Sequence, residues 1–295
     1  MRRCSGECCP GGDPLPDQPS SPSDQDGDPF AIDTSVAYPA RVHDYLAGGD
    51  SNFAADRELA DALGETLPGG IDTARTAVRA LGAVMRRTVR HLAGEEDVDQ
   101  FLNIGATIPT ARKIHEVAQQ AAPGSRFVYV GDDPVVLAHA HTLRGSAPEG
   151  ASAYVHGSLR DPQAILQQAA ETLDLRQPVA LMLLTTLNFV PDADDPFEIV
   201  ARLLQAVPSG SYLTIAHASH DFGAEGMIEA AERLDKALEQ PYVLRSRAEI
   251  ARFFDGLDLV DPGLVQIDHW RPHDDSPVPR TERPTPIYVA VGRKP

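Results

Sequence analysis

Residues 101–133 read FLNIGATIPTARKIHEVAQQAAPGSRFVYVGDD, and this stretch decides the fold of the chain. Its apolar start predicts a buried strand, Gly105 predicts a turn, and the run that follows predicts an amphipathic helix. A second apolar strand comes at 127–130 and ends in a turn that carries Asp132 and Asp133. A strand, a helix and a second strand in this order predict a doubly wound α/β fold.

The same unit predicts an adenosine site. In doubly wound proteins the first turn lets the backbone approach the ligand, and an acid after the second strand accepts the ribose hydroxyls. The dinucleotide fingerprint G-x-G-x-x-G is incomplete here, because Thr107 and Thr110 replace its second and third glycines. This opposes a nicotinamide cofactor, whose pyrophosphate needs close backbone approach. S-adenosyl-L-methionine has no phosphate, and the single glycine is compatible with it.

The composition narrows the class of protein. The chain of 295 residues is long enough for a sizeable core, and its 42% hydrophobic and 23% charged residues are ordinary for a soluble globular protein. A formal net charge of -17 disfavours a nucleic-acid partner, since phosphate binding relies on Lys and Arg. No apolar run approaches the length of a membrane span. We therefore expect a small-molecule partner and neither a membrane nor a nucleic-acid partner.

The N-terminal segment differs from the rest of the chain. Residues 1–36 are rich in Pro, Gly, Ser and Asp and are predicted to form a disordered acidic tail. The three cysteines of the chain, Cys4, Cys8 and Cys9, all lie there, so no core disulfide can form, as suits a reducing cytoplasm. Because this cluster lacks a nearby histidine or a fourth thiol, we expect no metal site.

Residues 37–295 are predicted to form a single domain, with a helical region at 37–94 and a Rossmann-like core at 98–295. Two helices flank a break at Gly48 and Gly49 ahead of the first strand. Such a pair is either a lid over a pocket or an ordinary α-hairpin that closes one end of the sheet. The helix that follows carries arginines that we interpret as a solvated face, namely Arg75, Arg79, Arg86, Arg87 and Arg90.

Strands and helices go on alternating to the end of the chain. We expect helices at 71–92, 162–173, 196–206 and 224–238 and after the capping box Ser246-x-x-Glu249, and strands at 153–155, 179–184, 211–216, 264–267 and 287–291. This alternation implies a mostly parallel sheet. The last two strands suggest an antiparallel hairpin at one edge.

Three of the expected helices begin with an Asp-Pro pair, at Asp133, Asp161 and Asp195. Aspartate caps the free amides of a first helical turn, and proline fits the first helical position, where no amide donor is needed. We therefore interpret Asp133 as a helix cap and Asp132 as the ribose acceptor, although either carboxylate can serve.

Ligands of open α/β sheets bind beyond the carboxyl ends of the strands. If the topology is as predicted, five segments converge there, at 103–107, 131–133, 156–159, 185–189 and 217–220.

Read together, several motifs resemble the class I S-adenosylmethionine-dependent methyltransferases, and more closely an actinobacterial family of such enzymes. The motifs occur in order as ARVHDYLAGGDSNFAADRE, IGATIPT with HEVAQ, DDPVVLAHA, LRDPQAIL, LNFVPD, GSYLTIAHAS and YVAVGRKP. The resemblance covers nearly everything from residue 40 onward. It implies a Rossmann-like, seven-stranded sheet with extra N-terminal helices, a bound S-adenosylmethionine and transfer of its methyl group to a small-molecule acceptor.

The resemblance also implies the positions that contact the cofactor. These are Tyr45, Gly48, Gly49, Asn52, Asn103, Gly105, Ala106, Thr107, Asp132, Asp133, Ser158, Leu159, Asn188 and Phe189. Methyl transfer relies mainly on positioning of the reactants, so a catalytic base is not obligatory. The candidates for one are Tyr45, His217 and His220.

Several positions depart from the family pattern. Asn103 and Gly131 stand where acids end the first two strands, Ser158 stands where an acid usually follows the third, and Asn188 replaces a frequent histidine. Neutral groups make weaker hydrogen bonds than charged ones, which predicts a weakened cofactor site. The alternative is a catalytically degraded methyltransferase fold that serves as a binding or regulatory module.

Overall fold

The computed structural model describes most of the chain after residue 31. The described residues are 32–67, 69–105, 114–136, 150–222, 224–238, 240–272 and 285–295. The predicted tail up to residue 31, with its three cysteines, lies outside them, as do the candidate site residues Ala106 and Thr107. Residues 32–295 cluster as one compact unit.

A mixed sheet forms the centre of the fold, with the strand order β3-β2-β1-β4-β5-β8-β6, and β7 also pairs with β8. The parallel strands are β1 (Gln100–Ile104), β2 (Arg126–Gly131), β3 (Ser152–His156), β4 (Ala180–Leu184) and β5 (Tyr212–Ala218). The antiparallel strands are β6 (Asp258–Leu259), β7 (Val265–Gln266) and β8 (Ile287–Arg293). The predicted Rossmann-like architecture is confirmed.

Within the described residues, the sheet has eight strands rather than the seven expected. The two-residue strands β6 and β7 pair with different parts of β8, so together they occupy the position of one longer edge strand. The predicted antiparallel pairing of the strands near 264–267 and 287–291 is confirmed as β7 with β8.

The helices lie close to the predicted ranges. They are α1 (Pro39–Ala47), α2 (Ala54–Thr66), α3 (Ile71–Gly94), α4 (Ile114–Ala121), α6 (Pro162–Ala169), α7 (Pro196–Gln205), α8 (Ala224–Leu238) and α9 (Arg247–Ala251), with the short 3-10 helices η1 (Thr186–Phe189), η2 (Asp192–Asp194), η3 (Arg252–Phe254) and η4 (Ile267–His269). Helix α6 stops short of residue 173, because the amides of Glu171 and Thr172 turn to acceptors three residues back. None of the described helices is both long and apolar enough to cross a membrane.

The predicted caps are present. The Asp161 and Asp195 side chains accept hydrogen bonds from backbone amides of α6 and α7. Ser246 and Glu249 form the predicted capping box at the start of α9. Each motif satisfies amides that a helix leaves without partners in its first turn, which is why these helices begin where the sequence indicated.

Alternating side chains of the central strands fill two layers of core. On β1, Phe101 packs with residues of α3 and α4, whereas Leu102 packs on the other face with residues of α6 and α7. All five β1 residues are buried. Strands covered on both faces read as nearly continuous apolar runs, which is the pattern that predicted this unit.

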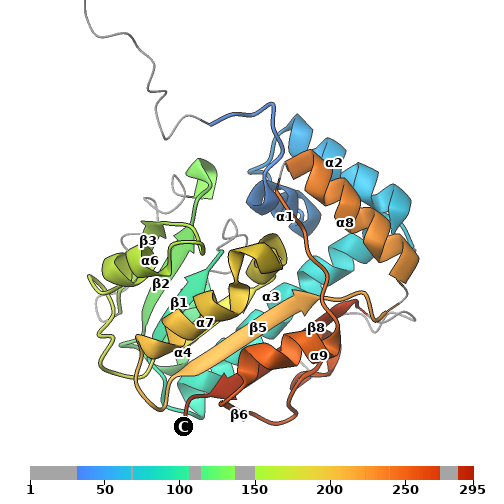
Figure 1. Cartoon of the computed structure of the whole chain (residues 1–295). Coiled ribbons are helices and arrows are strands. Elements are labelled where there is room, and N and C mark those ends of the chain that lie inside the picture. Colours follow the sequence, from blue (N-terminus) through green and yellow to red (C-terminus); the bar gives the residue numbers. More distant parts are fainter. Residues whose placement is uncertain are drawn as a thin grey trace, which may run out of the picture. The chain divides into compact units, whose positions relative to one another are not determined.

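A third core cluster joins α1, α2 and α3 to α8. Figure 1 shows α8, which comes late in the sequence, lying beside α2. Val42, Leu63 and Val78 contribute to this cluster from the three N-terminal helices, and Leu238 contributes from α8. The N-terminal helices thus form an apolar layer of their own next to the sheet.

One prediction about α3 is wrong. Arg87 is buried rather than solvated: its Nε donates to the Trp270 carbonyl oxygen at 2.9 Å, and its NH2 donates to that of Ile267 at 3.1 Å. Burial lowers the pKa of the Arg87 guanidinium. The side chain ties α3 to the chain around η4, whereas Arg79 and Arg90 are exposed as predicted.

Candidate functional site

The candidate site lies at the carboxyl ends of the parallel strands, where the strand order reverses between β1 and β4. Gly105 follows β1 with a φ of 80°, a left-handed conformation that favours glycine. A Cβ atom there would overlap the side chain of Thr186, whose Oγ1 donates to the Ile104 carbonyl oxygen at 2.7 Å. The predicted turn is confirmed, and it needs glycine to lie against the end of β4.

The two acids after β2 occupy different environments. Asp133 is buried, and its Oδ1 accepts a hydrogen bond of 2.8 Å from the Val135 amide. Burial raises the pKa of Asp133, while the Val135 amide and the nearby Arg41 act in the opposite direction. Asp132 is exposed and lines the cavity described next. The cap assigned to Asp133 is thus present, and the Asp132 carboxylate is accessible to a ligand.

A cavity of about 280 Å³ opens at these strand ends. Its polar end is lined by residues at the end of four parallel strands or directly after them, namely Gly105, Gly131, Asp132, Ser158, Leu159, Arg160, Thr185 and Thr186. Arg160 is held in place, since its Nε pairs with Asp194 at 2.8 Å and its NH2 donates to the Phe189 carbonyl oxygen at 3.0 Å. The segments expected to converge here therefore do so, except that of the last one only Ala218 reaches the cavity.

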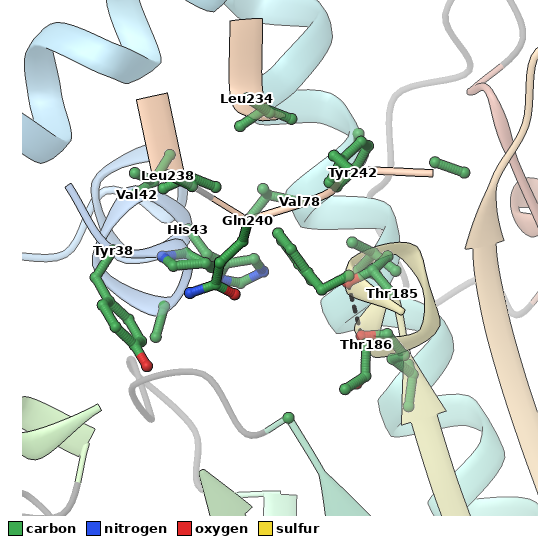
Figure 2. Close-up of a pocket in the computed structure, with 18 of the residues that line it drawn as sticks. Tyr38, Val42, His43, Val78, Thr185, Thr186, Leu234, Leu238, Gln240 and Tyr242 are labelled. Carbon is green, nitrogen blue, oxygen red and sulfur yellow. Dashed lines mark hydrogen bonds between the residues drawn. The ribbon is translucent and has the colours of Figure 1, made fainter. Parts of the chain in front are cut away.

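The opposite end of the cavity is an apolar space between helices, which we call the helical chamber. It is lined by Val42, Leu46, Leu63, Leu67, Ala74, Ala77, Val78, Leu81, Met227, Ala230, Ala231, Leu234 and Leu238. Figure 2 shows the His43 ring and the Gln240 side chain in the space between Leu234 and Leu238 on one side and Thr185 and Thr186 on the other.

His43 is the ionisable group of α1 that faces the chamber. Burial lowers the pKa of its imidazole from 6.5 to about 4, so the ring is neutral at physiological pH. Among the described residues, it has no hydrogen-bond partner. A neutral imidazole offers one bare nitrogen as an acceptor, and here that nitrogen is available to a ligand.

The Gly48-Gly49 motif is built around a buried aspartate. The Asp44 carboxylate accepts hydrogen bonds from the Ser51 amide at 2.8 Å and from the Asn52 side chain at 2.9 Å. Gly48 has a φ of 85°, and a Cβ atom on Gly49 would overlap the Asp44 carboxylate. These contacts give the glycines and Asn52 a structural role in the turn between α1 and α2.

Two further candidates belong to a buried network. His217 accepts a hydrogen bond of 2.9 Å at Nε2 from Arg245 and lies 2.8 Å through Nδ1 from the Ala218 carbonyl oxygen. Asn188 donates to the Val243 carbonyl oxygen at 2.7 Å and accepts from the Ala218 amide at 3.3 Å. Burial lowers the pKa of His217 to about 4. Both side chains thus serve to hold the segment after β4.

The structure brings together some of the predicted cofactor positions and not others. The cavity is lined by Gly105, Asp132, Asp133, Ser158, Leu159 and Phe189. It is not lined by Tyr45, Gly48, Gly49, Asn52, Asn103, Asn188, His217 or His220. The Tyr45 hydroxyl instead donates to Asp61 at 3.2 Å, and His220 lies 3.5 Å from Asp221. Their assignment to a ligand remains a prediction.

The cavity is also lined by residues that no sequence motif indicated, namely Tyr38, His43, Gln240 and Tyr242. Burial and the neighbouring Asp132 carboxylate raise the pKa of Tyr38, and burial raises that of Tyr242 to about 12. A signal for His43 was present, because it lies on the helical face that carries Val42 and Leu46. A histidine on such an apolar stripe faces the core or a cavity.

Comparisons with known proteins agree with this geometry. The model of a family described as S-adenosyl methyltransferases matches residues 25–295. The structure is similar to that of a DUF574 family protein from Streptomyces avermitilis, with 41% identity, a TM-score of 0.84 and coverage of 90% of this chain and 100% of that one. A Thermobifida fusca protein described as a candidate methyltransferase shows 35% identity, a TM-score of 0.79 and coverage of 89% and 96%. No curated protein matches the chain.

Proposed function

Because this chain belongs to the S-adenosyl methyltransferase family, we propose that it transfers the methyl group of S-adenosylmethionine to a small organic acceptor bound in the cavity. The observation that carries the proposal is the shape of that cavity. A single cavity is lined at one end by the turns after four parallel strands and at the other by the helical chamber. A cofactor and an acceptor can therefore meet inside it.

The residues of the polar end suit an adenosyl ligand. The accessible Asp132 carboxylate is proposed to accept hydrogen bonds from the ribose hydroxyls, and the backbone at Gly105 allows close approach. Ser158 and Leu159 are proposed to contact the adenine from the turn after β3. When bound, the cofactor supplies an electrophilic methyl group on a sulfonium. The chain contributes mainly orientation, which can supply several kcal/mol of a barrier, on the order of 7 to 11 in favourable cases.

The neutral residues that replace acids are expected to lower the affinity for the cofactor rather than to change the shape of the cavity. Gly131 and Ser158 line the cavity without charge, and Asn103 is buried in β1 on the same face as Phe101. If each lost acid costs about 1 kcal/mol, cofactor binding is weaker by roughly fivefold per position. We therefore expect a site that fills only at high cofactor concentration.

The acceptor is proposed to be a small molecule, and the reaction to take place in the cytoplasm. The net charge of -17 disfavours a nucleic-acid substrate, and the described residues contain no membrane-spanning helix. The three cysteines lie outside the predicted domain, so a reducing compartment would cost the fold no disulfide.

Calorimetric titration of S-adenosylmethionine and S-adenosylhomocysteine into the full chain tests the cofactor part of the proposal. We expect both to bind, and Asp132→Asn to weaken binding roughly tenfold through the loss of one charge-assisted hydrogen bond. Asp255→Asn is the matched control, since Asp255 is an exposed carboxylate outside the cavity. A folded protein that binds neither compound at millimolar concentration would contradict the proposal and leave a binding or regulatory module.

A further inference from the structure

The helical chamber limits the charge that an acceptor can carry. Four helices contribute its apolar lining: Val42 and Leu46 come from α1, Leu63 from α2, Val78 from α3 and Leu234 from α8. Transfer of an ionised group from water into such surroundings is costly unless an opposite charge meets it. Among the described cavity residues, the charged groups Asp132, Asp133 and Arg160 all come from the turns after β2 and β3.

Each of these three charged groups already has a partner. Arg160 pairs with Asp194, and Asp133 accepts the Val135 amide and lies 3.4 Å from Arg41. The Asp132 carboxylate interacts with the Tyr38 hydroxyl, at the end assigned to the cofactor. The described part of the chamber therefore holds no free cation for an acidic acceptor and no free anion for a basic one.

His43 is a polar side chain within this mostly apolar lining, and its position indicates contact with a ligand. Its imidazole is neutral, lies in the space between the apolar side chains and the strand ends, and has no partner among the described residues. The ring is partly exposed to the cavity, and a ligand that donates a hydrogen bond to it should bind more tightly than a matched ligand that cannot. The other polar groups of this region are Gln240, the hydroxyls of Thr73, Thr185 and Thr186, and the hydroxyls of Tyr38 and Tyr242. The two tyrosine hydroxyls stay protonated because their pKa values are raised.

We infer that the acceptor is an uncharged, mostly apolar molecule with one weakly acidic hydroxyl, of the phenol class, which donates a hydrogen bond to His43. The inference rests on the proposed function and names the substrate class of that site. In the reaction the hydroxyl oxygen forms a bond to the methyl carbon, and the electron pair of the breaking carbon–sulfur bond stays on sulfur. The hydroxyl proton passes to His43.

The charge balance supports this assignment. Before transfer the reacting groups carry one positive charge, on the sulfonium, and the imidazole is neutral. After transfer they are a neutral thioether and an imidazolium that carries the one positive charge. The number of charges in the apolar space does not change, so the reaction needs no counterion to enter it. A carboxylate acceptor would instead enter as a buried anion in the chamber.

Binding of three matched probes to the protein in the presence of saturating S-adenosylhomocysteine tests the inference. The probes are 2-naphthol, naphthalene and 2-naphthoate, which share an apolar ring system and differ in having a hydroxyl, no polar group or a carboxylate. Equilibrium dialysis should show 2-naphthol binding roughly fivefold to tenfold more tightly than either of the others, the ratio expected for one net hydrogen bond.

The variant His43→Phe should lower the affinity for 2-naphthol to that for naphthalene and leave naphthalene binding unchanged. His269→Phe is the control, because His269 is exposed and does not line the cavity. Equal or tighter binding of 2-naphthoate by the wild type would overturn the inference, as would a loss in His43→Phe that is the same for all three probes. The wild-type preference among the probes decides the case even if His43→Phe does not fold.

The two proposals fail separately. Calorimetry with S-adenosylhomocysteine reports on the cofactor site, whereas the probe panel, repeated without it, reports on the chamber. A chain that binds no S-adenosylhomocysteine but prefers 2-naphthol contradicts the proposed function and supports the ligand class. A chain that binds S-adenosylhomocysteine but shows no preference supports the proposed function and contradicts the inference.

Discussion

The Nε atom of Arg41 lies 3.4 Å from the Oδ2 atom of Asp133, which joins helix α1 to the turn that follows β2. Both side chains are buried, and the guanidinium also lies 5.4 Å from the ring centres of Tyr38 and Phe53. It donates to the Val36 carbonyl oxygen at 3.2 Å as well. A buried charge therefore holds the N-terminal helices against the strand end that carries the candidate cofactor site.

Removal of this guanidinium should destabilise the fold. Arg41→Met keeps most of the side-chain volume but leaves Asp56 and Asp133 buried without a cation, which typically costs about 3 to 5 kcal/mol. Urea denaturation measures the free energy of unfolding. Arg75→Met is the matched control, because its pair with Asp72 is partly solvated and should be worth less than about 1 kcal/mol. Equal losses in the free energy of unfolding for the two variants would show that the buried ion pair does not stabilise the fold.

The glycine pair after α1 allows two kinds of strain to be compared. Gly48→Ala meets no atom within 4 Å, but it places a side chain at a φ of 85°, at a cost of roughly 1 to 2 kcal/mol. Gly49→Ala would push a methyl group into the buried Asp44 carboxylate and should cost more. Thermal unfolding ranks the two variants. We expect Gly48→Ala to keep the affinity for S-adenosylhomocysteine, and a large loss would return these glycines to the cofactor site.

Stability should depend on the protonation of His217. Its pKa is lowered from 6.5 to about 4 in the folded protein, so the unfolded chain binds the additional proton between these values. The free energy of unfolding should therefore fall as the pH drops from about 6.5 to about 4, with up to about 3 kcal/mol from this residue. Urea titrations at several pH values measure the slope. His217→Gln should flatten it, whereas His220→Gln, at a partly exposed site, should not.

Restoring one acid should strengthen cofactor binding if the proposed orientation is right. Ser158 is exposed in the cavity, where the family pattern has an acid. Ser158→Asp should lower the dissociation constant of S-adenosylmethionine roughly fivefold, the effect of about 1 kcal/mol. Calorimetry at pH 7 gives the value, with Ser158→Asn as the uncharged control. Unchanged or weaker binding in the aspartate variant would place the adenine elsewhere.

Local patterns were sufficient to predict most of the central sheet. The apolar runs of β1 and β2 and the Asp-Pro pairs at Asp161 and Asp195 act within a few residues of where they occur. For that reason the turn at Gly105 and the cap at Asp133 were also predictable. Strand β6 was not, because its two residues are exposed and it is defined by pairing with β8.

The features that the sequence did not reveal depend on contacts between distant segments. Arg87 is buried because the carbonyl oxygens of residues 267 and 270 accept hydrogen bonds from it. The sequence of α3 itself does not indicate those partners. His43 faces a cavity because α8, nearly two hundred residues later, closes the other side of it. The apolar periodicity of α1 indicates which face of the helix is covered, but it does not indicate that a cavity lies opposite His43.

Helix α8 supplies one wall of the chamber, and it packs on α2. The strand ends that carry the adenosyl ligand's proposed contacts come from other parts of the chain. Exchange of this one helix between relatives would therefore reshape the acceptor pocket while leaving the cofactor half intact. Divergence of substrate range in such proteins needs no change to the machinery that they share.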